Sequence, residues 1–356
     1  MLPTLRAFGR AEIRATCPNG HRVPKSLGMV RDLHIPLAGG PSSGKSSLAA
    51  GAFVELATVG REAGLGVELA GEDARKFARV IRGLATGTEP AKTIQQRQPA
   101  LLARLRRPGR KRDVFLFAYD VAGELYADAD RVRAAQSLDY ISGAVLVVDP
   151  GSVPALAREK RAEIAAQAGL KVSTEEPADV YSRLVNALRE RGVDIGRLRL
   201  AVVLTKVDAL DVREDLERID DGVEALATAP ARAWLELHGQ DALVGRAEQD
   251  FKEVGFFAAS ALGRSPDASG LPFEPQGALE PIRWIMSRNG FQIPQLQGPV
   301  DEEVDLGVSQ DFAGGTVHRT RSRGAWHTRA RDRAPRPAVE LSRINVLAHL
   351  PYAVVL

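Results

Sequence analysis

Short apolar runs alternate along this chain with longer stretches in which apolar residues recur at helical spacing. Six runs have the length and the Leu, Val, Ile and Phe content of strands, and they cover residues 33–38, 101–106, 113–119, 144–148, 198–204 and 253–258. The helical stretches cover residues 47–60, 126–138, 153–191, 210–249 and 276–288. Strands that alternate with helices predict an α/β fold with a mostly parallel, doubly wound sheet.

The second and third runs differ from the others because a turn, Pro108-Gly109, joins them. Apolar residues alternate along residues 101–106, whereas residues 113–119 (DVFLFAY) are apolar on both faces. A strand of the latter kind belongs inside a sheet that helices cover on both sides. The two runs therefore predict a hairpin that adds one antiparallel strand to the sheet.

Composition divides the chain into an N-terminal segment (residues 1–30), an α/β domain (residues 31–290) and a tail (residues 291–356). The tail starts with five acidic residues among residues 301–311, and eight arginines without a lysine follow between residues 319 and 343. Such a composition buries too little apolar surface to offset chain entropy, and it predicts a disordered tail. A translation-frame accident in the gene would produce the same composition, so a function of the tail stays open.

The 356 residues are 44% hydrophobic and 26% charged, as expected for a globular protein, and the net charge of +3 is too small to indicate a partner. Cys17 is the only cysteine, so no intramolecular disulfide can form. The first residues lack the apolar core of a signal peptide, and the longest apolar run, residues 141–148, is too short to span a bilayer. These features predict a cytoplasmic protein without a transmembrane segment.

The first chemical motif lies between the first strand and the first helical stretch. Residues 39–46 (GGPSSGKS) fit G-x-x-x-x-G-K-[ST], a loop whose backbone N–H groups surround phosphate oxygens at a helix N-terminus. Lys45 can reach the β and γ phosphates, and the Ser46 hydroxyl can ligate Mg²⁺. The candidate phosphate-binding residues are Gly39, Ser42, Ser43, Gly44, Lys45, Ser46 and Ser47.

The second motif, residues 120–124 (DVAGE), follows the apolar strand of the hairpin. Asp120 can hold Mg²⁺ through water, as a Walker B carboxylate does. Gly123 lacks a Cβ, so its backbone can approach the γ-phosphate closely and donate its N–H. An Asp before a glycine-containing turn is a common strand ending, so the value of this motif lies in its position.

Two further motifs follow the last two predicted strands. In residues 205–208 (TKVD), the Asp208 carboxylate can accept both the N1–H and the N2–H of guanine, a donor pair that adenine lacks. The aliphatic part of Lys206 can pack on the base. After the last strand, Ser260-Ala261-Leu262 can present a backbone N–H to the guanine O6. The candidate base-contacting residues are Thr205, Lys206, Asp208, Ser260, Ala261 and Leu262.

In this order, each at the carboxyl end of a predicted strand, the four motifs resemble the G1, G3, G4 and G5 motifs of Ras-like, TRAFAC-class P-loop GTPases. The resemblance covers residues 33–289, and DVAGE resembles the variant found in large bacterial double-GTPase domains. It implies a three-layer P-loop NTPase sheet of six strands, with one antiparallel hairpin strand and helical insertions. It also implies a Mg²⁺-dependent molecular switch that binds GTP and GDP, hydrolyses GTP slowly and contacts a protein effector or activator.

The sequence departs from the Ras-like pattern where hydrolysis is concerned. Spacing does not identify the switch I threonine; Thr93 is assigned over Thr86 and Thr88 because it lies nearest the hairpin, and an exposed loop threonine is the alternative. Glu124 stands where many relatives carry a catalytic glutamine. The resemblance thus assigns catalytic roles to Glu124, Thr93 and Gly123. It assigns Mg²⁺ to Ser46, Thr93 and Asp120.

Three weaker patterns carry less chemistry. Cys17 and His21 have the spacing of half a zinc site, but zinc needs four ligands and only His34 lies near in sequence, so no metal site is expected. Six basic residues among residues 104–112 form either a solvated turn or a docking patch for an anionic partner. The Arg-rich tail could contact nucleic acid or anionic lipid through charge alone, because Trp326 is its only interleaved aromatic residue.

Three functions fit these motifs. The leading one is a GTPase switch. A GTP-binding scaffold that hardly hydrolyses stays open because of Glu124. A P-loop ATPase or kinase is disfavoured because adenine would leave the Asp208 carboxylate unpaired.

Overall fold

The computed structural model describes residues 31–70, 74–85, 100–106, 113–121, 138, 140–166, 170–222, 230–264 and 271–293, together with four short strands nearer the chain ends. The chain divides into two compact units. The first comprises Met1–Ile293 and Ala353–Leu356, and the second comprises Pro294–Tyr352. The first unit contains the predicted α/β domain.

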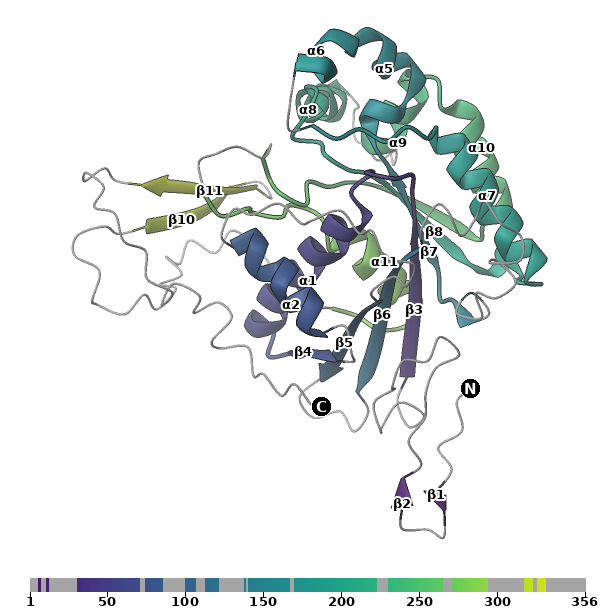
Figure 1. Ribbon diagram of the computed structural model, residues 1–356, viewed down its shortest axis with the longest axis vertical. Helices are drawn as coiled ribbons and strands as arrows, with labels where there is room; N and C mark the ends of the chain where they lie inside the picture. Colours follow the sequence, from purple (N-terminus) through teal and green to yellow (C-terminus); the bar gives the residue numbers. More distant parts are fainter. Residues whose placement is uncertain are drawn as a thin grey trace. The chain divides into compact units, whose positions relative to one another are not determined.

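A seven-stranded sheet of the described residues forms the centre of the first unit, in the order β4-β5-β6-β3-β7-β8-β9 (Figure 1). The strands are β3 (Arg31–Ala38), β4 (Gly66–Ala70), β5 (Ala100–Arg106), β6 (Val114–Val121), β7 (Ala144–Val148), β8 (Arg199–Leu204) and β9 (Glu253–Ala258). Strands β6, β3, β7, β8 and β9 are parallel to one another, and β5 runs antiparallel to both of its neighbours. The predicted α/β fold with one antiparallel hairpin strand is confirmed.

Helices cover both faces of this sheet and complete three layers. Helices α1 (Lys45–Glu62), α2 (Ala74–Ala85) and α11 (Glu280–Arg288) lie on one face, and α7 (Pro177–Glu190), α9 (Pro230–Leu237) and α10 (Asp241–Asp250) lie on the other (Figure 1). The described residues also form η3 (Pro150–Ser152), α5 (Pro154–Glu159), α6 (Arg161–Ala166), η4 (Ile195–Arg197) and α8 (Val212–Gly222). In their described parts, the predicted stretches 153–191 and 210–249 each contain three separate α-helices.

Strand β4 and helix α2 are elements that the apolar pattern did not predict. In the five residues of β4 (GVELA), Gly66 and Glu68 interrupt the apolar run, so the run looks too weak for a strand. Pairing with β5 places Glu68 opposite Arg104, and Glu68 accepts a hydrogen bond from Arg106 at 3.3 Å. The sheet therefore has one strand more than the Ras-like resemblance implied. Helix α2 had a readable signal, since Val80, Ile81 and Leu84 recur at helical spacing.

The larger apolar core lies between the sheet and helices α7, α9 and α10. Leu184 of α7 and Trp234 of α9 are fully buried in the same cluster as Leu146 of β7 and Val202 of β8. All five residues of β7 are buried, because this strand has neighbours on both sides and helices on both faces. This central position holds the carboxyl ends of β3, β7 and β8 at one rigid edge.

Short hairpins lie near the two ends of the chain. In the N-terminal segment, β1 (Arg6–Ala7) pairs with β2 (Ala11–Glu12), and in the second unit β10 (Val317–Ser322) pairs antiparallel with β11 (Ala325–Ala330). The composition of the tail did not predict these two strands. They lack an apolar run, and the backbone hydrogen bonds of a hairpin do not require one. The rest of the second unit lies outside the described residues, and its disorder stays a prediction. No helix in the described part of the chain is long and apolar enough to cross a membrane.

Candidate functional site

The glycine-rich loop connects β3 to α1, as its motif predicted. Helix α1 begins at Lys45, two residues earlier than the periodicity indicated. Gly44 has φ +94°, which a residue with a side chain rarely adopts, and Ser42 also lies in the left-handed region with φ +62°. A Cβ at Gly39 would lie 2.5 Å from Ser43 Oγ and 3.1 Å from the Val147 carbonyl oxygen. The tight loop therefore requires glycine at both ends.

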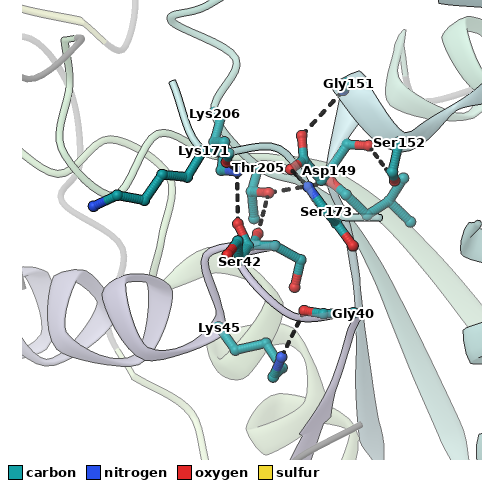
Figure 2. A network of polar contacts seen from close by, with 12 residues as sticks. Gly40, Ser42, Lys45, Asp149, Gly151, Ser152, Lys171, Ser173, Thr205 and Lys206 are labelled. Atoms are coloured by element: carbon teal, nitrogen blue, oxygen red, sulfur yellow. Dashed lines mark hydrogen bonds and ion pairs between the residues drawn. The ribbon is translucent and has the colours of Figure 1, made fainter. Parts of the chain in front are cut away.

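Lys45 is held against the loop that precedes it. Its Nζ donates to the carbonyl oxygens of Gly39 and Gly40, each at 2.8 Å, and the residue is only 7% exposed (Figure 2). The N-terminus of α1 adds its partial positive charge at the same place. Ser46 and Ser47 occupy the second and third positions of this helix. The loop thus concentrates positive potential, which suits a phosphate ligand.

Thr205 and Lys206 connect the end of β8 to the glycine-rich loop (Figure 2). The Thr205 hydroxyl lies 2.8 Å from the Ser43 carbonyl oxygen and 3.2 Å from that of Val148, so its one proton is shared between them. Lys206 Nζ donates to the Ser42 carbonyl oxygen at 2.7 Å. These two hydrogen bonds join residues that are 162 and 164 positions apart in the sequence, so the two motifs are in direct contact.

Asp149 is the polar residue that the sequence reasoning missed. It follows β7, is 2% exposed, and accepts hydrogen bonds from Gly151 N at 3.0 Å and Ser173 N at 2.8 Å. Lys206 Nζ lies 2.6 Å from its Oδ2 and also donates to the Lys171 carbonyl oxygen. The sequence did contain a sign that Asp149 belongs to the site. Asp149 directly follows a fully apolar strand, and a candidate motif follows each of the other strands of that kind.

Residues 170–176, which precede α7, lie against the glycine-rich loop. A Cβ at Gly40 would collide with Ser173 Oγ and come 3.0 Å from Glu175 Cβ. Ser173 is buried, with 6% exposure, and its hydroxyl accepts a hydrogen bond from Glu175 N at 3.3 Å. This close packing explains a second glycine at the start of the loop.

Asp208 and Ser260 meet across β8 and β9. Ser260 is fully buried, and its hydroxyl donates to Asp208 Oδ1 and accepts the Gly263 N–H at 2.7 Å. The Ser260 backbone pairs with Gln276 in both directions, at 2.9 and 2.8 Å. Ala261 and Leu262 follow in the same loop. The predicted base-contacting residues are thus brought to one place, and Ser260 fixes the Asp208 carboxylate.

Glu55 anchors the segment that supports this loop to helix α1. It accepts the Leu279 N–H at 2.7 Å, just before α11 begins. Burial raises the pKa of Glu55, and the hydrogen bond from the Leu279 backbone partly opposes that rise. Arg213 of α8 donates to Gln276 Oε1 at 3.0 Å. Three helices therefore converge on the backbone that holds Ser260.

The remaining predicted site residues are less fully described. Asp120 lies in β6 opposite Leu37 of β3, two positions before the glycine-rich loop. Thr93, Gly123 and Glu124 lie outside the described residues, as do Cys17 and His21. In the basic stretch, Arg104 contacts Asp113 and Arg106 contacts Glu68. These two arginines form ion pairs with acidic residues in or next to the sheet. Residues 107–112 lie outside the described part of the chain.

A comparison with curated proteins found no match. A family model described as Double-GTPase 2 matches residues 33–242. The matched range starts in β3, includes the glycine-rich loop, Asp120 and Asp208, and ends in α10, before Ser260. Because it spans more than half of the 356 residues, the chain belongs to the Double-GTPase 2 family.

Proposed function

We propose that this protein is a Mg²⁺-dependent switch that binds GTP and GDP and hydrolyses GTP slowly. Membership of the Double-GTPase 2 family implies GTP binding. The observation that carries the proposal is the joining of three loops at one sheet edge. Lys206 contacts the glycine-rich loop, and Ser260 contacts Asp208. Ligands of open α/β sheets bind at this edge.

In the proposed complex, Lys45 and the N–H groups of residues 42–47 bind the phosphates. Asp208 accepts the N1–H and N2–H of guanine, and the Ser260 hydroxyl holds the carboxylate in orientation for them. The backbone of Ala261 or Leu262 donates to the guanine O6. Adenine would leave the Asp208 carboxylate unpaired, which supports a preference for guanine.

The same edge offers oxygen ligands that fit Mg²⁺. Ser46 lies at the start of α1, which follows β3 through the glycine-rich loop, and Asp120 lies in β6, which pairs with β3. Hard oxygen donors of this kind suit Mg²⁺, which would neutralise phosphate charge. Thr93 is proposed as the ligand that joins in the GTP state.

We expect Asp208→Asn to change nucleotide choice from guanine to xanthine. Wild type should bind GTP at least about a hundredfold more tightly than ATP, since adenine offers the Asp208 carboxylate neither of the two donors that guanine supplies. In the variant, the amide can donate to the xanthine O2 while its oxygen still accepts one donor. Equilibrium titration with GTP, ATP and XTP measures both preferences.

The control for this titration is Asp241→Asn, which removes an exposed carboxylate from the first turn of α10. It should keep the wild-type preference. Equal affinity of wild type for ATP and GTP would refute the role of Asp208.

Slow hydrolysis is proposed because of Glu124. A glutamine can accept from the attacking water and donate toward the γ-phosphate, whereas an ionised glutamate can only accept and adds repulsion. We therefore expect Glu124→Gln to hydrolyse GTP faster than wild type in a single-turnover assay. A much slower variant would show that the carboxylate acts as a base or water anchor.

The alternative function is a GTP-binding scaffold without turnover. Wild type that binds GTP tightly but gives no GDP over hours would favour it. For either function we propose a cytoplasmic protein with a protein effector or activator, such as one that supplies an arginine to the γ-phosphate. Charge contacts of the tail or hairpin with nucleic acid or lipid have less support, because Arg104 and Arg106 are already paired.

A further inference from the structure

The insertion between β7 and α7, which the structure describes at residues 150–166 and 170–176, reaches the candidate guanine site from two directions. Its helices α5 and α6 lie beside α8, which follows the TKVD segment (Figure 1). Leu156 of α5 belongs to the same buried cluster as Leu210 and Val212 at the start of α8. The insertion therefore shares one apolar core with the segment that follows Asp208.

The first contact is an ion pair between Lys160 and Asp211. Lys160 lies between α5 and α6, and its Nζ is 2.6 Å from Asp211 Oδ2 and 3.2 Å from Glu163 Oε2. The Lys160 side chain is 23% exposed and that of Asp211 is 53% exposed. The hydrogen bond to Asp211, more than any other contact, raises the pKa of Lys160, so the ammonium stays charged at neutral pH.

The loop that Lys160 holds is conformationally unfavourable. Leu210 and Asp211 both have φ +58°, although neither is glycine, and they follow Asp208 by two and three residues. Each left-handed residue of this kind costs about 1–2 kcal/mol unless its surroundings hold it. Burial of the Leu210 side chain restrains the first, at 4% exposure, and the Lys160 ion pair restrains the second.

The second contact lies at the other end of the insertion. The Lys171 carbonyl accepts from Lys206, and the Ser173 N–H donates to Asp149, which also pairs with Lys206 (Figure 2). Lys206 itself has φ +53°, so the stretch of residues 206–211 has an unfavourable backbone conformation at both ends. One insertion thus restrains residues 206–211 on both sides of Asp208.

We propose that the insertion is a built-in nucleotide-retention element, in which Lys160 acts through Asp211 as a positioning residue for Asp208. This inference rests on the proposed guanine-nucleotide function. Loosening residue 211 lets the Asp208 segment relax while GDP is bound, so GDP leaves faster. The encounter of GDP with the open site depends on the phosphate loop, so its association rate should hardly change.

The test is the dissociation rate of a fluorescent N-methylanthraniloyl-GDP from the full chain, chased with excess GDP. Lys160→Ala and Asp211→Asn are each expected to raise the rate roughly threefold to fivefold, the upper range for a partly exposed ion pair. Asparagine tolerates the left-handed backbone, so the second change removes the negative charge without disfavouring the backbone conformation. The double variant should be no faster than either single one, and Lys160→Arg should restore the wild-type rate.

The matched control is Arg197→Ala, which breaks an exposed ion pair with Asp194 before the start of β8, whereas residue 211 follows the other end of that strand. It should leave the rate unchanged, and urea unfolding should confirm that all variants are folded. A wild-type rate in Lys160→Ala, an additive double variant, or an equal change in association rate would each overturn the inference. If wild type binds no guanine nucleotide, the proposed function itself fails. If wild type binds GDP and the variants release it at the wild-type rate, the proposed function stands and only the retention element fails.

Discussion

Lys45→Ala is expected to lower the affinity for Mg·GTP by about a hundredfold, which corresponds to about 3 kcal/mol of charge-assisted hydrogen bonding. The Lys45 ammonium is held at the loop by the Gly39 and Gly40 carbonyl oxygens, so its charge is already placed for phosphate. Removing it leaves the negative charge of the β and γ phosphates less compensated. Titration with labelled GTP in the presence of Mg²⁺ measures the loss.

Two further variants separate phosphate binding from folding. Ser46→Asn should weaken Mg·GTP more than nucleotide without metal, because it changes the proposed Mg²⁺ ligand. Lys252→Ala removes an equal charge from an exposed position and should bind like wild type. Far-UV circular dichroism should change little in all three. Unaltered Mg·GTP affinity in both loop variants would show that the loop does not bind phosphate.

Asp149→Ala is expected to lower the free energy of unfolding by about 3 kcal/mol and also to weaken guanine-nucleotide binding. The variant removes the acceptor for two backbone N–H groups and one ammonium, and the carboxylate site is almost completely buried. Unpaired buried donors cost about 1–3 kcal/mol each, and partial exposure of Lys206 allows some rehydration. Urea unfolding measures the first effect and nucleotide titration the second.

Asp149→Asn serves as the conservative companion, since it keeps the side-chain shape but replaces one acceptor oxygen with a donor. We expect it to be intermediate in both measurements. Asp194→Ala is the matched control, because Asp194 is 64% exposed in a surface ion pair with Arg197 and should lose less than about 0.5 kcal/mol. An Asp149→Ala protein as stable as that control would contradict the assigned role of Asp149.

The order of strands and motifs was readable from the sequence because it depends on local patterns. Strands β7 and β9 occur with the predicted bounds. The apolar run of β7 is completely buried between two neighbouring strands, whereas β9 is a half-buried edge strand whose pattern still marked its ends. The glycine-rich loop was equally readable, because Gly44 needs a positive φ and Lys45 follows it at the start of a helix. Membership of the Double-GTPase 2 family confirms the family resemblance that the order of the motifs indicated.

Other features depended on partners far away in the chain and could not be read in advance. Strand β4 has a weak apolar pattern and is completed by its pairing with β5. Asp149 resembles any strand-end carboxylate until the fold brings Ser173 and Lys206 to it. The left-handed backbone at Leu210 and Asp211 contradicts local preference and is restrained by core packing and by Lys160. Local chemistry thus determined the fold class and the motifs, while only tertiary packing decided how the insertion meets the site.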